Sequence, residues 1–148
     1  MFEKILCCVD GSQNALRAAE AACALADKFG SRLTFLTVSK ELKPTEAVKR
    51  FLEIEHLSGE PQYVLDEYTE TIIEKAKDIA EKTGLRGVRT EVRTGNPARG
   101  IVEFAEHNKI DCIVMGARGV GDLSDLLLGS VSHKVSNMAK CTVITVRG

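Results

Sequence analysis

The sequence predicts an α/β domain with a parallel sheet covered by helices on both faces. Short apolar runs at residues 5–9, 33–38 and 112–115 are typical of strands buried on both faces. Segments with helical spacing of apolar residues lie between these runs, and such alternation requires right-handed crossovers. The chain has 148 residues, 44% hydrophobic and 28% charged. We therefore expect one compact domain over residues 1–148.

The first strand and helix follow directly from the N-terminus. The run 5–9 ends at the turn residues Asp10-Gly11-Ser12, and Ser12 is a good N-cap for a helix. Apolar residues then recur at helical spacing until Gly30, which predicts the end of that helix. Residues 33–38 form the second predicted strand.

The middle of the chain, from residue 44 to 84, has a helical pattern with one interruption. Residues 58–61 (Ser-Gly-Glu-Pro) break it into a short stretch at 48–57 and a longer helix. Gly84 is the predicted C-terminal cap of the longer helix. Its expected buried stripe consists of Leu65, Tyr68, Ile72, Ala76, Ile79 and Thr83.

The last third supplies three more strands. Residues 88–93 alternate apolar and polar, as in a strand near a sheet edge, and Asn96-Pro97 then begins a helix. A strand at 112–115, a helix at about 130–138 and a strand at 142–146 complete the order. In such sheets a ligand binds beyond the carboxyl ends of the strands, where strand order reverses. Asp10, Val38 and Gly116 are therefore candidate site residues.

Composition excludes several classes of protein. The net charge is −1, with two tyrosines and no tryptophan, so neither a phosphate-neutralising stripe nor a base-stacking platform is visible and nucleic-acid binding is disfavoured. No membrane span or signal-peptide layout is present, and we expect a cytoplasmic protein. The five cysteines, Cys141 included, lie in apolar surroundings and are expected to be reduced core thiols. Without paired ligands at short spacing, no metal site made by protein side chains alone is expected.

The segment after the fourth strand carries the candidate chemistry. It runs Gly116-Ala117-Arg118-Gly119, then nine residues, then Gly129-Ser130. Glycines let backbone amides approach an anion closely, and a helix N-terminus adds partial positive charge. Ser130 and Ser132 are candidate hydroxyl donors. The segment is neither a Walker A loop nor the Gly-x-Gly-x-x-Gly of dinucleotide folds.

This pattern resembles the ATP-binding signature of the universal stress protein family. The likeness covers nearly the whole chain, through residues 4–6 and 10–12, 95–98, 111–116 and 143–146. It implies a five-stranded parallel sheet in the order 3-2-1-4-5, in a three-layer domain of the adenine nucleotide alpha hydrolase-like type. It also implies a cytoplasmic homodimer formed through the fifth strand, and bound ATP with Mg²⁺ or Mn²⁺ on its phosphates.

The same resemblance assigns roles to individual residues. It implies that Asp10 lies near the ribose or adenine and Val38 near the base, with Arg118 as a phosphate contact. It implies that ribose and phosphates are held by Gly116, Gly119, Gly129, Ser130 and Val131. The chain departs from the family pattern at Asp125, where a basic residue is frequent, and at Thr142, where proline is frequent.

Plainer interpretations of these residues stay open. The glycines are also suitable turn residues, Ser130 is as good a helix cap as a phosphate donor, and Asp10 suits a turn or cap. Arg118 is equally consistent with a solvated loop arginine. His133 is expected to be an exposed side chain.

The favoured function is an ATP-binding stress-response regulatory module, in which nucleotide occupancy biases shape or dimer contacts and so changes binding to a protein partner. The alternative is a slow or partner-activated ATPase or phosphotransferase, which requires a positioned metal and a group that orients the nucleophile. No general base is evident in the loop, so catalytic residues stay unassigned. A nucleotide enzyme or flavoprotein with a related sheet is less consistent with residues 10–14, which lack a doubled glycine. A ligand-free dimer is the last alternative.

Overall fold

A computed structural model describes residues 1–39, 50, 61–120 and 128–148, with side chains of residues 61–65 outside the description. The predicted helical stretch at 48–57 and the departure at Asp125 lie outside the described residues. Five strands form one parallel sheet in the order β3-β2-β1-β4-β5. They are β1 (Lys4–Cys8), β2 (Arg32–Ser39), β3 (Arg89–Thr94), β4 (Cys112–Gly116) and β5 (Thr142–Val146).

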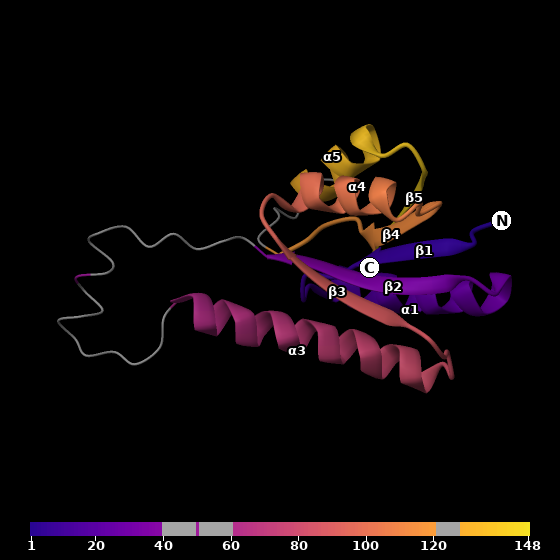
Figure 1. Cartoon of the computed structure of the whole chain (residues 1–148), viewed down its shortest axis with the longest axis horizontal. Helices are drawn as coiled ribbons and strands as arrows, with labels where there is room; N and C mark the ends of the chain where they lie inside the picture. Colours follow the sequence, from indigo (N-terminus) through magenta and orange to yellow (C-terminus); the bar gives the residue numbers. More distant parts are fainter. Residues whose placement is uncertain (40–49, 51–60, 121–127) are drawn as a thin grey trace.

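Helices cover both faces of this sheet. The described helices are α1 (Gln13–Phe29), α3 (Pro61–Lys82), α4 (Pro97–His107) and α5 (Ser130–Met138). In Figure 1, α4 and α5 lie on one side of the sheet and α3 lies on the other, where it packs against α1. The predicted three-layer fold and its 3-2-1-4-5 strand order are confirmed.

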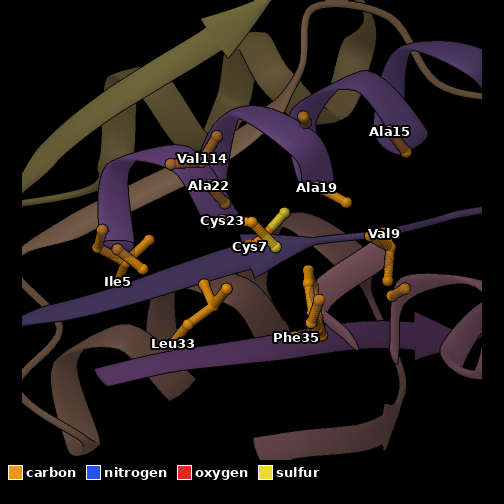
Figure 2. Close-up of a cluster of buried hydrophobic side chains, with 14 of the residues drawn as sticks. Ile5, Cys7, Val9, Ala15, Ala19, Ala22, Cys23, Leu33, Phe35 and Val114 are labelled. Carbon is orange, nitrogen blue, oxygen red and sulfur yellow. The ribbon is translucent and has the colours of Figure 1, made fainter. Parts of the chain in front are cut away.

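The core consists of two apolar clusters separated by the sheet. Along β1, Ile5 and Cys7 point into the cluster under α1 and α3, and Leu6 and Cys8 point into the cluster under α4 and α5. Figure 2 shows the first cluster, in which β1 and β2 side chains meet the alanines of α1. Small residues on that helix face allow α1 to lie close to the sheet.

The helix ends follow the expected capping chemistry. The Ser12 hydroxyl oxygen accepts a hydrogen bond from the Ala15 N–H at 3.1 Å, and Gly30 ends α1 in the left-handed conformation. Asn96 caps α4 in the same way, accepting from the Arg99 N–H at 3.0 Å, with Pro97 in the first turn. These local predictions are confirmed.

Two details of the sequence prediction are wrong. The helix α3 begins at Pro61, inside the predicted breaker, because proline is well suited to a first helical turn. Its buried face is also rotated from the predicted stripe: Ile72 and Ala76 are buried as predicted, but Tyr68 is 48% exposed and Thr69 is buried instead. The orientation is set by packing of α3 on α1 and β2, which sequence periodicity does not encode.

The cysteines match the expectation with one exception. Cys7, Cys8, Cys23 and Cys112 are buried free thiols, but Cys141 is only half-buried because it precedes the edge strand β5. Within the described residues, no helix is long and apolar enough to cross a membrane.

Candidate functional site

A cavity of about 460 Å³ lies at the carboxyl ends of the central strands. The chain leaves β1 toward β2 on one side, and β4 pairs with β1 on the other, so this is the point where strand order reverses. Eight of the nine predicted site residues line it: Asp10, Val38, Gly116, Arg118, Gly119, Ser130, Val131 and Ser132. The ninth, Gly129, immediately precedes the last three of them.

One wall of the cavity is apolar. It is formed by Leu36 and Val38 from β2, Pro97 and Ile101 from α4, and Met115 from β4. Strand β2 and helix α4 pack together on this side of the sheet, which fixes the positions of these side chains. This wall can accept a flat apolar group.

The N-terminus of α5 forms another part of the lining. Its N-cap is Gly129, which offers no side-chain hydrogen bond to the first turn. The first amides of an α-helix have no intrahelical acceptor and carry the positive end of the helix dipole. Residues 130–132 present this turn to the cavity, so this part of the lining suits an anionic group.

Gly129 has a clear structural role in the same region. Its N–H donates to the Ala117 carbonyl at 2.6 Å, and its own carbonyl accepts from the His133 N–H at 2.9 Å. Gly129 therefore ties the glycine loop to α5 and starts the helix. His133 is exposed, as the sequence predicts.

The two candidate serines differ in environment. Ser130 is exposed at the cavity, and its hydroxyl forms no hydrogen bond with the described part of the chain. Ser132 is only 2% exposed, and its hydroxyl lies 2.6 Å from the Ala117 carbonyl and 3.2 Å from the Gly129 carbonyl. A hydroxyl has one hydrogen, and that hydrogen is used within the fold. These bonds argue against Ser132 as a hydroxyl donor to a ligand.

Asp10 connects the end of β1 to the glycine loop. Its carboxylate accepts the Ser12 N–H at 3.0 Å, which is the turn-forming role left open by the sequence. The other carboxylate oxygen accepts the Val120 N–H at 3.1 Å. A carboxylate has further lone pairs, so Asp10 can also accept hydrogen bonds from a ligand.

Gly116 is required by packing within the chain. A Cβ atom at this position would lie 2.8 Å from the Asn14 Cβ and 2.9 Å from the Asn14 carbonyl carbon. The first turn of α1 therefore fits against β4 only because residue 116 has no side chain. Nearby, the Asn14 side-chain amide donates to the Arg118 carbonyl at 3.4 Å, which helps to hold the loop against α1.

The Cys8 thiol also lines the cavity, and its surroundings favour the protonated form. Burial raises the pKa of the Cys8 thiol well above its ordinary value, and the neighbouring Asp10 carboxylate raises it further. Cys8 therefore stays protonated near neutral pH. Across residues 1–39, 50, 61–120 and 128–148, no group of three or more His, Cys, Asp or Glu side chains is placed to hold a metal ion.

Sequence reasoning missed the contribution of α3 to this site. Tyr68, Thr69 and Ile72 line the cavity from that helix. The Tyr68 hydroxyl lies over Gly11, where an added Cβ would be 2.6 Å away and the backbone φ is +88°. The sequence shows only a glycine at position 11, which does not indicate that another helix approaches there.

Fold and cavity define a doubly wound α/β protein with a cavity at the switch point of its sheet. The model of the Universal stress protein family matches residues 1–147, and the chain belongs to this family. The chain is 34% identical to the universal stress protein YxiE of Bacillus subtilis, over 99% of this chain and 100% of that protein. It is 35% identical to the universal stress protein MJ0531 of Methanocaldococcus jannaschii, with coverage of 99% and 83%.

Solved structures show the same relationship. The universal stress protein UspA from Lactobacillus plantarum superposes with a TM-score of 0.81 at 28% identity, covering 99% of this chain and 98% of that chain. A universal stress protein solved in complex with cAMP superposes with a TM-score of 0.72 at 25% identity, with coverage of 98% and 97%.

Proposed function

We propose that this protein binds an adenine nucleotide in the 460 Å³ cavity, with ATP as the ligand and Mg²⁺ or Mn²⁺ held through its phosphates. We propose further that occupancy of this site regulates binding to a protein partner in a stress response. The observation that carries the proposal is the pairing of an apolar wall with an uncapped helix N-terminus at the switch point of the sheet.

The apolar wall suits the adenine base. Val38, Leu36 and Ile101 form a hydrophobic surface of the kind that binds flat aromatic groups, and the cavity volume is within the roughly 300–1,000 Å³ typical of small-molecule sites. Asp10 also lines the cavity and binds the Val120 N–H, and its carboxylate can accept a further hydrogen bond from a ribose hydroxyl.

The N-terminus of α5 suits the phosphates. Amides of residues 130–132 and the exposed Ser130 hydroxyl are donors, and Gly119 and Arg118 line the same cavity. The related protein solved in complex with cAMP supports an adenine nucleotide as the ligand class.

Binding rather than turnover is the favoured activity. In the described lining, Asp10 is the one carboxylate, and it already accepts two backbone N–H groups. Nucleotide that binds one conformation more tightly than another shifts the population toward it, which is the proposed regulatory mechanism. The Asp10–Val120 hydrogen bond is a contact that an incoming ligand can alter. We place this module in the cytoplasm as a homodimer paired through the edge strand β5.

The base-binding wall can be tested with two matched substitutions. Val38→Phe adds a ring inside the cavity, whereas Val92→Phe adds the same ring at a 44% exposed position on the neighbouring strand β3. In calorimetric titrations with Mg²⁺ and ATP, Val38→Phe should weaken binding by about tenfold or more, equivalent to about 1.4 kcal/mol. Val92→Phe should bind like the parent protein. Equal affinity in all three proteins would contradict the assignment of the cavity.

A further inference from the structure

A second hollow, of about 350 Å³, lies at the opposite end of the sheet. It is bordered by Lys4 at the start of β1 and by Arg32 at the start of β2, whereas the nucleotide cavity lies beyond Cys8 at the end of β1. Four residues of extended chain separate Lys4 from Cys8, which is roughly 13 Å. The two cavities are therefore distinct sites.

The lining of this hollow is strongly basic. It contains the cationic side chains Lys4, Arg32, Arg86 and Arg89, and Glu91 as its one carboxylate among the described residues. The chain as a whole has a net charge of −1, so this concentration of positive charge is local. Strand pairing explains it: Lys4 is opposite Arg32, and Thr34 is opposite Arg89, so the basic side chains emerge on the same face of the sheet.

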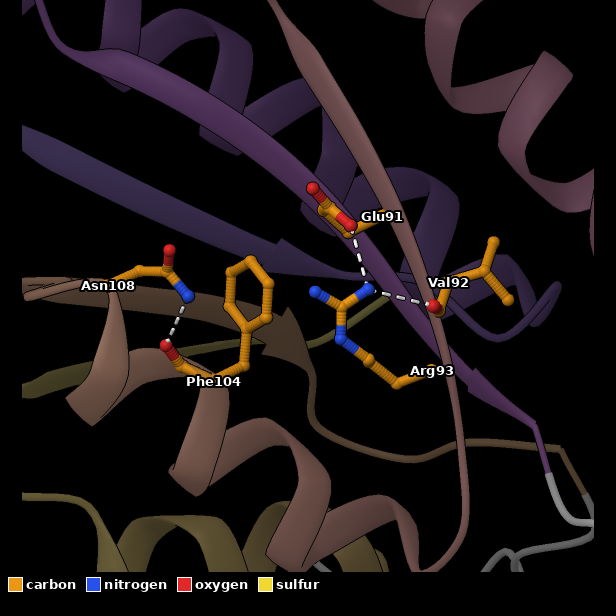
Figure 3. Close-up of polar contacts among 5 residues, drawn as sticks. All are labelled: Glu91, Val92, Arg93, Phe104 and Asn108. Atoms are coloured by element: carbon orange, nitrogen blue, oxygen red, sulfur yellow. Dashed lines mark hydrogen bonds and ion pairs between the residues drawn. The ribbon is translucent and has the colours of Figure 1, made fainter.

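The single carboxylate of the lining is already neutralised. The Glu91 carboxylate pairs with the Arg93 guanidinium at 2.8 Å, and that guanidinium also lies 5.3 Å from the centre of the Phe104 ring. Figure 3 shows this arrangement, with Phe104 of α4 between Arg93 and the Asn108 side chain. The ring of Phe104 thus forms an apolar border next to the basic side chains.

The cations that face the hollow have few competing partners. The guanidinium groups of Arg32, Arg86 and Arg89 form no hydrogen bond or ion pair with any part of the chain that the structure describes. Lys4 donates to the Asn108 carbonyl at 3.2 Å, and an ammonium group has two further hydrogens. Each free guanidinium can bind a phosphate or carboxylate through two parallel hydrogen bonds.

We propose that this hollow is a second binding site, for a small ligand that carries several phosphate or carboxylate groups. Three guanidinium groups and an ammonium around one hollow match clustered negative charges on a compact molecule. Nucleic acid is a poorer match, because its backbone requires an extended stripe of cations. The proposal does not depend on nucleotide binding in the first cavity.

The test is a titration of ¹⁵N-labelled protein with tripolyphosphate, followed by amide chemical shifts, with citrate in a parallel arm. Saturable shifts at residues 31–34 and 86–91 are expected. They are distinguishable from shifts at residues 116–120 and 129–132, which would report phosphate in the nucleotide cavity. The stronger of the two probes identifies phosphate or carboxylate as the preferred group.

Two triple variants distinguish binding at this hollow from general attraction of anions to positive surface charge. The change Arg32→Gln, Arg86→Gln and Arg89→Gln should weaken binding in the second hollow by about tenfold or more, because charge-assisted hydrogen bonds are lost. The control, Lys28→Gln, Lys75→Gln and Arg99→Gln, removes the same charge at exposed positions elsewhere. It should weaken binding by about twofold or less.

The proposal is overturned if residues 31–34 and 86–91 do not shift, or if both triple variants weaken binding equally. The amide spectra also report whether each variant is folded. If the first triple variant is unfolded, Arg89→Gln and Arg89→Lys replace it. Arg89→Lys should then retain more affinity than Arg89→Gln, and equal affinity of both with the parent protein would overturn the proposal.

Discussion

The contact of Gly116 with α1 predicts that Gly116→Ala destabilises the protein even without a ligand. An alanine Cβ would lie 2.8 Å from the Asn14 Cβ, 2.9 Å from the Asn14 carbonyl carbon and 3.0 Å from the Ala15 nitrogen. Carbon atoms in ordinary contact are about 3.5–4.0 Å apart. Because backbone atoms of a capped helix cannot rotate away, the first turn of α1 or the end of β4 must shift.

The expected cost is that of overpacking a core, about 1–3 kcal/mol. For a chain of this size each kcal/mol lowers Tm by about 2–4 °C, so a fall of about 2–12 °C is expected. The measurement is thermal unfolding by circular dichroism of protein from which any nucleotide has been removed. The parent protein is treated in the same way.

Gly100→Ala is the matched control. Its Cβ would lie 3.2 and 3.3 Å from the two methyl carbons of Val38, a side chain that can move into the adjacent cavity. Alanine also favours the helix α4 by up to about 1 kcal/mol, which offsets the contact. A Tm of Gly116→Ala equal to that of the parent protein would refute the reasoning, and so would an equal loss in Gly100→Ala.

Three further predictions concern the cap, the thiols and the assembly. Ser12→Ala removes the hydroxyl that accepts from the Ala15 N–H and should lower the unfolding free energy by about 1 kcal/mol in urea titrations; an unchanged midpoint would contradict this role. Burial raises the pKa of the Cys112 thiol from 9.0 to about 11. The folded state therefore retains a proton that the unfolded state releases, so stability should fall between these pH values by at most about 1.4 kcal/mol per pH unit. Cys112→Ala should show a smaller fall, and an identical pH profile would argue against the shift. Light scattering should give twice the protomer mass of 16.1 kDa, and a single protomer mass would contradict pairing through β5.

The sequence predicts the described elements well because their signals are local. Ser12, Gly30 and Asn96 cap helices through neighbouring backbone groups, and the apolar runs identify the strands buried on both faces. The strand order was a consequence of the family resemblance, since the residues alone predict a parallel sheet without ordering it. The structure agrees with both the parallel sheet and the strand order.

The candidate site was only partly accessible to sequence reasoning. The glycine motif located Gly119 and Ser130 at the cavity, but the rotation of α3 that brings Tyr68 there depends on tertiary packing. The motif also could not show whether Gly116 and Ser132 are required by a ligand or by packing within the fold. Gly116 is explained by close approach of α1, and the Ser132 hydroxyl is used to tie α5 to the loop.

The most direct test of nucleotide binding is to purify the protein gently, denature it, and identify any released nucleotide by chromatography. The same is done for Gly119→Val, which adds a side chain at a residue that lines the cavity, and for Val92→Phe as a control. The account predicts ATP from the parent protein and from Val92→Phe, and none from Gly119→Val. ADP or AMP in place of ATP would favour the ATPase alternative. No nucleotide in any sample, together with no thermal shift on adding Mg²⁺ and ATP, would contradict the central claim.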